Sequence, residues 1–178
     1  MKTFIQLQQE LQEASKKSSY RQEVKHESGL SSAMVSAHRG DLSQEENNKR
    51  HKDLKSQVKK SGHGYVEITG RYVEHDPETG KKRQVTEKSL KIDAKGQGKK
   101  HHTVLKGLAT ALGRRYNQDS VAITSKKRGS ALHGLKKGGW PGKGKRVPVG
   151  SFHRDPPEGE EFASYMARPG KGFVFKKD

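Results

Sequence analysis

Histidines are the first residues to consider as metal ligands or proton carriers at neutral pH. The chain has nine of them and no cysteine. No two histidines show the H-x3-H or HExxH spacing that places two imidazoles on one helix face to hold zinc. The lack of cysteine excludes thiolate metal sites, iron–sulfur clusters and cysteine nucleophiles. We therefore expect no metal and no cofactor.

A second group of reactive side chains lies on an expected β-hairpin. Glu87 and Ser89 share one face of the strand QVTEKSLKI, and Arg71 and Glu67 are candidates to face them from the other strand. No nucleophile–base pair or carboxylate dyad is recognisable. The pattern favours cross-strand ion pairs over a catalytic site. Three further polar residues are expected near this group: Arg39, Glu46 and Gln118.

The elements that must position these residues follow from apolar spacing and capping residues. Ser43 and Glu46 form the S-x-x-E capping box of a helix that ends at Ser61 and Gly62. The next two segments form an antiparallel hairpin, in which Gly70 interrupts the apolar face and indicates a bulge or a close contact. A second helix has a continuous apolar stripe, with Thr103 as its N-cap. A short strand, SVAIT, and a C-terminal hairpin follow.

This order predicts an α+β fold, with a small, mostly antiparallel sheet, two helices packed on one face, a flexible N-terminal segment and a basic loop. Residues 1–37 are expected to be an N-terminal peptide and linker. Residues 38–178 are expected to be one domain with a basic, glycine-rich insertion at 126–154. Hydrophobic residues make up only 28% of the chain, so the core must be small. No apolar run is long enough for a membrane helix or a secretory signal, and we expect neither.

The charge of the chain indicates a polyanionic partner. The formal net charge is +17, and residues 126–154 contain nine Lys or Arg and no Asp or Glu. Phosphate backbones bind such stretches with release of counterions. The segment GQGKKHHT adds basic groups before a helix start, and Trp140 could stack on a base. A solvated basic loop and a Trp packed over the domain edge are the alternatives. The expected nucleic-acid contacts are Lys99, Lys100, Arg114, Arg115, Lys126, Lys127, Arg128, Lys136, Lys137, Trp140, Lys143, Lys145 and Arg146.

Two parts of the chain resemble known proteins. The N-terminus MKTFIQLQQELQEA resembles the capsid-targeting peptide of internal head proteins in large tailed bacteriophages. That resemblance implies cleavage by a prohead protease between Glu13 and Ala14. The segments HRGDLSQEENNKRHKDL, GYVEITGRYVE, TEKSLKI, LGRRYNQDSVAI and EFASYMARPGKGFVFK resemble an uncharacterised family of small phage and bacterial α/β proteins. The second resemblance implies one α/β domain and no particular reaction.

Charge and resemblance together predict a bacteriophage protein, associated with the virion or injected, that binds DNA or RNA non-specifically through phosphate contacts. On this hypothesis it is a basic, DNA-binding internal head protein rather than an enzyme. It would be located in the virion interior or the host cytoplasm, with the capsid or a host protein as further partners. The alternatives are a phage protein that binds and modulates a host protein, or a small enzyme acting on nucleic acid with Glu87 at its site.

Overall fold

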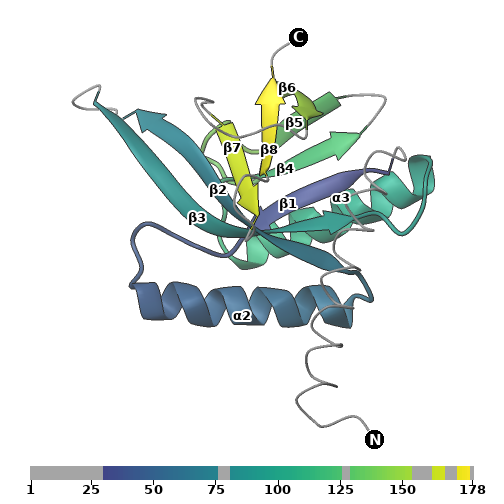
Figure 1. Cartoon of the computed structure of the whole chain (residues 1–178), viewed down its shortest axis with the longest axis horizontal. Coiled ribbons are helices and arrows are strands. Elements are labelled where there is room, and N and C mark those ends of the chain that lie inside the picture. The colour runs from purple at the N-terminus through teal and green to yellow at the C-terminus, as the bar shows by residue number, and fades with distance from the viewer. Residues whose placement is uncertain (1–29, 76–80, 126–128, 154–161, 167–171, 177–178) are drawn as a thin grey trace, which may run out of the picture.

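The computed structural model describes residues 30–75, 81–125, 129–153, 162–166 and 172–176 (Figure 1). Eight strands form one closed antiparallel barrel in the order β1-β3-β2-β7-β8-β6-β5-β4. The α+β class, with an antiparallel sheet and two helices, is confirmed. The elements are β1 (Ser32–Ser36), α2 (Gln44–Lys60), β2 (Tyr65–His75), β3 (Lys82–Asp93), α3 (Lys99–Arg115), β4 (Ser120–Ser125), β5 (Gly129–Gly134), β6 (Arg146–His153), β7 (Phe162–Met166) and β8 (Gly172–Lys176).

The first strand closes the barrel. β1 pairs with β3 on one side and with β4 on the other, so that Met34 lies between Lys91 and Ala122. The sequence predicts this segment as linker, which is wrong. Its alternation is hard to recognise because Ser, Ala and Met dominate it, and it becomes a strand only through partners distant in the chain. The barrel therefore includes residues on the N-terminal side of the expected boundary at residue 37.

The two helices begin in different ways. α2 has the predicted capping box, in which the Ser43 side chain accepts from the Glu46 N–H and the Glu46 carboxylate accepts from the Ser43 N–H. The predicted N-cap of α3, Thr103, is wrong. The N-cap is Gly98, five residues earlier, whose φ of 90° turns the chain and whose carbonyl accepts from the His102 N–H.

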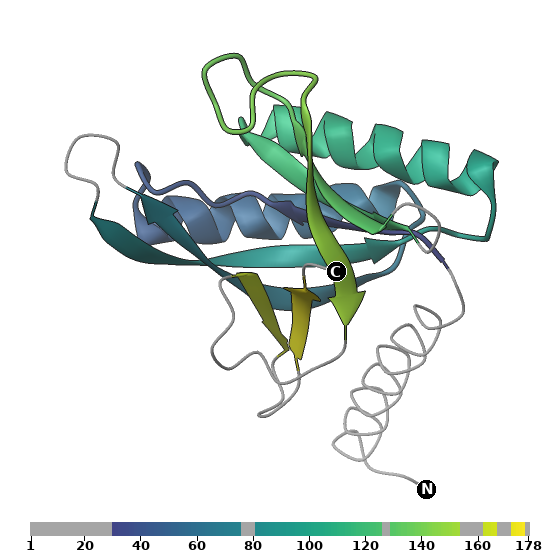
Figure 2. The ribbon, with the colours of Figure 1, turned by 90° about the horizontal axis from the view of Figure 1, so that it is seen from above.

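The main core lies between the two helices and the outer face of the sheet. α2 contributes Leu54 and Val58, which are fully buried. Figure 2 shows both helices on one side of the molecule, with β7 and β8 on the other. Tyr116 joins the helices, because its hydroxyl donates to Asp53 Oδ2 at 2.7 Å. The sheet residues in this core are Ala33, Val35, Leu90, Ile92, Val121 and Ile123.

The expected basic insertion contains regular structure. β5 and β6 lie within residues 126–154 and pair with each other, and β5 also pairs with β4. Between them, the Gly134 N–H donates to the Lys145 carbonyl, and the Gly144 N–H donates to the Gly134 carbonyl. Of the expected N-terminal peptide and linker, residues 1–29 lie outside the described residues.

Candidate active site

A row of polar side chains on β3 faces the inside of the barrel. Successive strand residues point to opposite faces of a sheet, and Leu90 and Ile92 belong to the core beneath the helices. The residues that alternate with them therefore face the barrel interior. They are Glu87, Ser89, Lys91 and Asp93.

Burial increases along this row from Glu87 to Lys91. Glu87 is half-buried, Ser89 is 7% exposed and Lys91 is 1% exposed. Solvent therefore reaches the row at Glu87 and again at Asp93, whose side chain is 13% exposed, whereas Lys91 between them is buried. A buried charge needs a partner, and Lys91 Nζ lies 2.6 Å from Asp93 Oδ1.

Hydroxyl groups from neighbouring strands lie at the Asp93 end of the row. Ser32 Oγ donates to Asp93 Oδ1 at 2.7 Å. Beside it, Thr124 Oγ1 and Ser130 Oγ are 2.9 Å apart and buried. The Lys91–Asp93 pair is therefore part of the internal structure of the barrel, and Glu87 is the half-buried residue at the other end of the row. Sequence reasoning missed Lys91, although a Lys between two core residues of a strand was a signal for an inward-facing charge.

The strand register corrects the expected partners of Glu87. Gly70 lies opposite Glu87 in the β2–β3 pairing, whereas Arg71 is paired with Thr86 and Glu67 with Leu90. The pairing shifts by no residue along β2 and β3, so the bulge suggested at Gly70 is absent from this strand pair. Glu67 and position 71 thus belong to the opposite face of the hairpin from Glu87.

Glu67 instead forms a polar cluster with α2. Its carboxylate lies 3.2 Å from His51 Nε2 and accepts from Lys55 Nζ at 3.0 Å. Burial raises the pKa of Glu67, but the hydrogen bonds from Lys55 and His51 outweigh burial and lower it overall. Burial lowers the pKa of His51 despite the neighbouring carboxylate.

A second histidine lies behind His51. The rings of His38 and His51 meet edge to face with centroids 5.8 Å apart. His38 Nε2 and His51 Nδ1 are buried and have no hydrogen-bond partner among the described residues. Burial also lowers the pKa of His38. The pair is uncharged at neutral pH and lies outside the barrel, beside α2.

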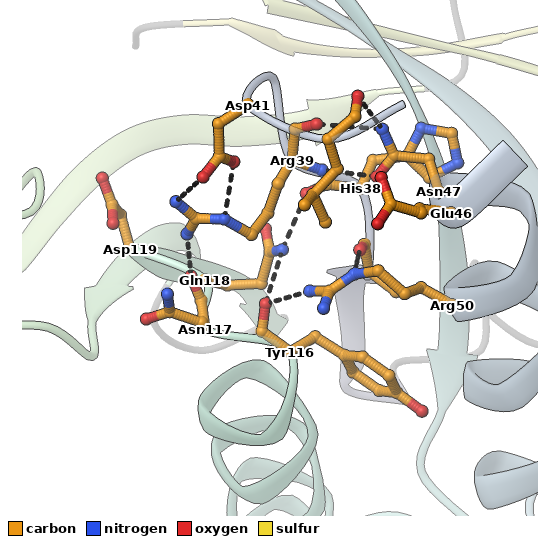
Figure 3. Close-up of polar contacts among 12 residues, drawn as sticks. His38, Arg39, Asp41, Glu46, Asn47, Arg50, Tyr116, Asn117, Gln118 and Asp119 are labelled. Carbon is orange, nitrogen blue, oxygen red and sulfur yellow. Dashed lines mark hydrogen bonds and ion pairs between the residues drawn. The ribbon is translucent and has the colours of Figure 1, made fainter. Parts of the chain in front are cut away.

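The remaining polar residues expected near Glu87 form a separate network at the end of β1 (Figure 3). Arg39 forms two hydrogen bonds with Asp41 and one with the Asn117 carbonyl, and Gln118 Nε2 donates to the His38 carbonyl at 2.8 Å. Glu46 caps α2. These side chains bind backbone or neighbouring charges, so they hold the chain between β1 and α2 against the end of α3.

The expected nucleic-acid contacts lie on several elements of the described part of the chain. Lys99 and Lys100 begin α3, whereas Arg114 and Arg115 end it, roughly 20 Å away at 1.5 Å per residue. Arg115 pairs with Asp53 at 3.3 Å, and Lys136 lies 4.0 Å from Asp119.

The other expected contacts are divided between the β5–β6 connection and residues outside the described part of the chain. Lys137, Trp140, Lys143 and Lys145 follow β5, and Arg146 begins β6. Trp140 is 56% exposed. Five of the expected site residues lie outside the described residues: Glu13, Ala14, Lys126, Lys127 and Arg128. Processing at Glu13 stays a prediction.

The described residues contain no group of three or more His, Cys, Asp or Glu that could hold a metal ion. In the same part of the chain, none of the helices has the length and apolar character needed to span a membrane. The candidate site is the inward-facing polar row of β3 within the antiparallel barrel. Eight strands leave an interior that either side chains fill or one small ligand occupies.

Comparison with known proteins identifies the family. A model of the S-adenosylmethionine lyase family matches residues 33–176, which span most of the chain. The chain therefore belongs to the S-adenosylmethionine lyase family. The comparison with curated proteins gives no match.

Two solved structures are similar to parts of the chain. One is a phage S-adenosylmethionine lyase in complex with S-methyl-5′-thioadenosine, with 23% identity and a TM-score of 0.35, covering 60% of this chain and 81% of that one. The other is a phage S-adenosylmethionine lyase in its apo state, with 20% identity and a TM-score of 0.34, covering 79% of this chain and 90% of that one. The assignment rests on the family model, because TM-scores this low do not establish a common fold.

Membership of a lyase family overturns the main functional prediction. The expected non-enzymatic, DNA-binding internal head protein is wrong, as are its nucleic-acid and capsid partners, because the family is one of enzymes named for a small-molecule substrate. The alternative of a small enzyme fits better. Net charge reports on solubility and non-specific association rather than on the reaction, which is why the basic stretch misled the prediction.

Proposed function

We propose that this protein cleaves a carbon–sulfur bond of S-adenosylmethionine without water or a redox partner. The observation that carries the proposal is the family match over residues 33–176, which includes β1 and every other strand of the barrel. The bond between the sulfonium sulfur and Cγ of the methionine part is the one whose cleavage releases S-methyl-5′-thioadenosine.

Two routes balance for this cleavage. In the first, the substrate's own carboxylate attacks Cγ, the C–S bond electrons return to sulfur, and S-methyl-5′-thioadenosine and homoserine lactone form with no net proton transfer. In the second, a base removes a proton from Cβ and the same C–S bond breaks, giving S-methyl-5′-thioadenosine, vinylglycine and a proton. The first route needs no catalytic base from the protein.

The barrel interior supports the first route on physical grounds. A carboxylate and a sulfonium cancel each other's charge as they react, so the transition state is less charged than the bound substrate. Removal of water favours such a charge-cancelling step. The increasing burial from Glu87 towards Ser89 and Lys91 provides an environment of this kind.

We assign Glu87 the role of binding the cationic substrate at the accessible end of the row. A carboxylate about 4 Å from a unit positive charge contributes up to ~4 kcal/mol at an effective dielectric constant of about 20. The sulfonium loses its charge during the reaction, so this attraction stabilises the bound substrate more than the transition state. Glu87 therefore acts mainly through KM.

The decisive experiment incubates the purified full chain with S-adenosylmethionine in H2(18)O and follows the products by liquid chromatography and mass spectrometry. We expect S-methyl-5′-thioadenosine with either homoserine lactone or vinylglycine. Lactone that later opens in solution carries the label in its carboxyl group. Label in the γ-hydroxyl group would show direct attack by water on Cγ. Either that result or unchanged S-adenosylmethionine would refute lyase activity.

Glu87→Gln tests the assigned residue. We expect KM for S-adenosylmethionine to rise about 10- to 100-fold with a smaller change in kcat, because the substitution removes charge and keeps shape. The matched control is Glu45→Gln, which changes a carboxylate that is 79% exposed on α2. An unchanged KM in Glu87→Gln would remove Glu87 from the site.

A further inference from the structure

Neither a positive φ nor a close contact requires glycine at position 70, a property shared with Gly40 and Gly107. A positive φ explains seven of the others, among them Gly62 and Gly98. Close packing explains Gly113 and Gly139, where a Cβ atom would run into Leu135 and Asp119. Gly70 has neither property: its φ is ordinary, and a Cβ there would meet its nearest atoms only at 3.8–3.9 Å.

The position makes the lack of a side chain costly. Gly70 lies within an eleven-residue strand, hydrogen-bonded to β3 on one side and to β7 on the other. Glycine weakens a strand because it orders a flexible backbone and packs no side chain. Alanine would fit the backbone and the space, so the fold does not require glycine here.

The side chains next to Gly70 belong to two polar residues of β3. A Cβ atom at Gly70 would point towards Glu87 Cγ at 3.9 Å and Ser89 Oγ at 3.8 Å. Gly70 and Glu87 are both half-buried, whereas Ser89 is almost fully buried. The bare backbone thus lies beside the Glu87 side chain and the Ser89 hydroxyl group, where the barrel changes from half-buried to buried.

We infer that Gly70 is a specificity-determining residue, against whose Cα the sulfonium group of the substrate lies, between the Glu87 carboxylate and the Ser89 hydroxyl. The inference rests on the proposed function. A sulfonium carries three carbon substituents and needs a close approach to a carboxylate without a protruding methyl group in between. Glycine is the residue that allows a ligand to approach the backbone in this way. The size of the group at residue 70 then limits the size of the alkyl group on sulfur.

The test compares Gly70→Ala with the wild-type chain on S-adenosylmethionine and on S-adenosylethionine, which has ethyl in place of methyl on sulfur. One added methyl group in a fitted site costs about 10- to 200-fold in kcat/KM. We expect a loss of that size with the methyl substrate and a larger loss with the ethyl substrate. The melting temperature should stay the same or rise, because alanine is the better strand residue.

Gly107→Ala is the matched control. Gly107 lies in α3, and a Cβ there would meet nothing within 4 Å. Alanine should stabilise the helix and leave kcat/KM for both substrates unchanged. The ratio of the two kcat/KM values is the deciding quantity, because partial unfolding of Gly70→Ala would lower both values equally and leave the ratio unchanged.

Two results would overturn the inference: a Gly70→Ala chain with the wild-type ratio of methyl to ethyl substrate, or one within twofold of wild-type kcat/KM. Its failure is separable from failure of the proposed function. A wild-type chain that binds S-adenosylmethionine calorimetrically but leaves it intact refutes the lyase assignment, and the ratio of Kd values for the two sulfonium compounds then decides the role of Gly70. A wild-type chain that neither binds nor cleaves it refutes both.

Discussion

Arg50 is the residue whose removal should most clearly separate the helices from the barrel. It lies on α2 and donates from Nε to the Ala37 carbonyl at 2.7 Å and from Nη2 to the Tyr116 carbonyl at 2.5 Å (Figure 3). Its guanidinium also lies 5.5 Å from the centre of the Tyr116 ring. One side chain thus connects the end of β1, α2 and the end of α3.

The magnitude follows from these contacts. A hydrogen bond to a charged group contributes about 1.5–3 kcal/mol, and an unsatisfied buried carbonyl adds a desolvation penalty. We expect Arg50→Met to lower the free energy of unfolding by about 3–4 kcal/mol. In a chain of this length, that corresponds to a decrease in Tm of roughly 6–15 °C. Arg50→Lys should lie between Met and wild type, because one ammonium replaces a fork that reaches two carbonyls.

Urea unfolding followed by circular dichroism measures the effect, with Lys52→Met as the control. Lys52 is exposed on the same helix, so its replacement should change the free energy of unfolding by less than about 0.5 kcal/mol. A loss below about 1 kcal/mol in Arg50→Met, or equal losses in Arg50→Met and Arg50→Lys, would show that the guanidinium does not hold the three elements together.

Two further predictions concern buried charge. Lys91→Met should lower the free energy of unfolding by about 3–5 kcal/mol, because it leaves the Asp93 carboxylate without its ammonium partner. The double variant with Asp93→Asn should recover part of that loss in the same urea experiment. Burial, followed by the charges of Lys106 and Arg146, lowers the pKa of His133 to about 4. Between pH 6.5 and 4 the unfolded chain then binds a proton that the folded chain does not, so the free energy of unfolding falls as the pH falls. His133→Asn should reduce that slope, and an unchanged slope would contradict the pKa.

Local signals in the sequence were sufficient for α2 and for the central hairpin. Ser43 and Glu46 lie three apart, which is the spacing at which each caps the other, and the structure has that box. The apolar positions of β2 and β3 predicted two strands, and Leu90 and Ile92 do share the core face. These features depend on residues close together in the chain, so a single sequence contains the information.

Features that depend on distant partners could not be predicted in the same way. The hairpin pattern gave the face of Glu87 but not its register, and a shift of one residue decides whether Gly70 or Arg71 lies opposite it. β1 has a weak pattern of its own and is a strand because β3 and β4 flank it. The identity of the substrate was beyond the sequence pattern altogether, since the cationic stretch dominated the composition and carries no information about a small ligand.

Closure of the barrel by β1 affects both the rate of folding and the tendency of the chain to aggregate. Ser32 is paired with Asp93 and with Thr124, so the ring is completed by contacts between residues far apart in the chain, and such contacts form slowly. Until they form, β3 and β4 each present a row of unpaired backbone groups that can add a strand from another molecule. The short segment from Ser32 to Ser36 therefore protects the protein against strand-mediated aggregation, a role that its modest, serine-rich composition conceals.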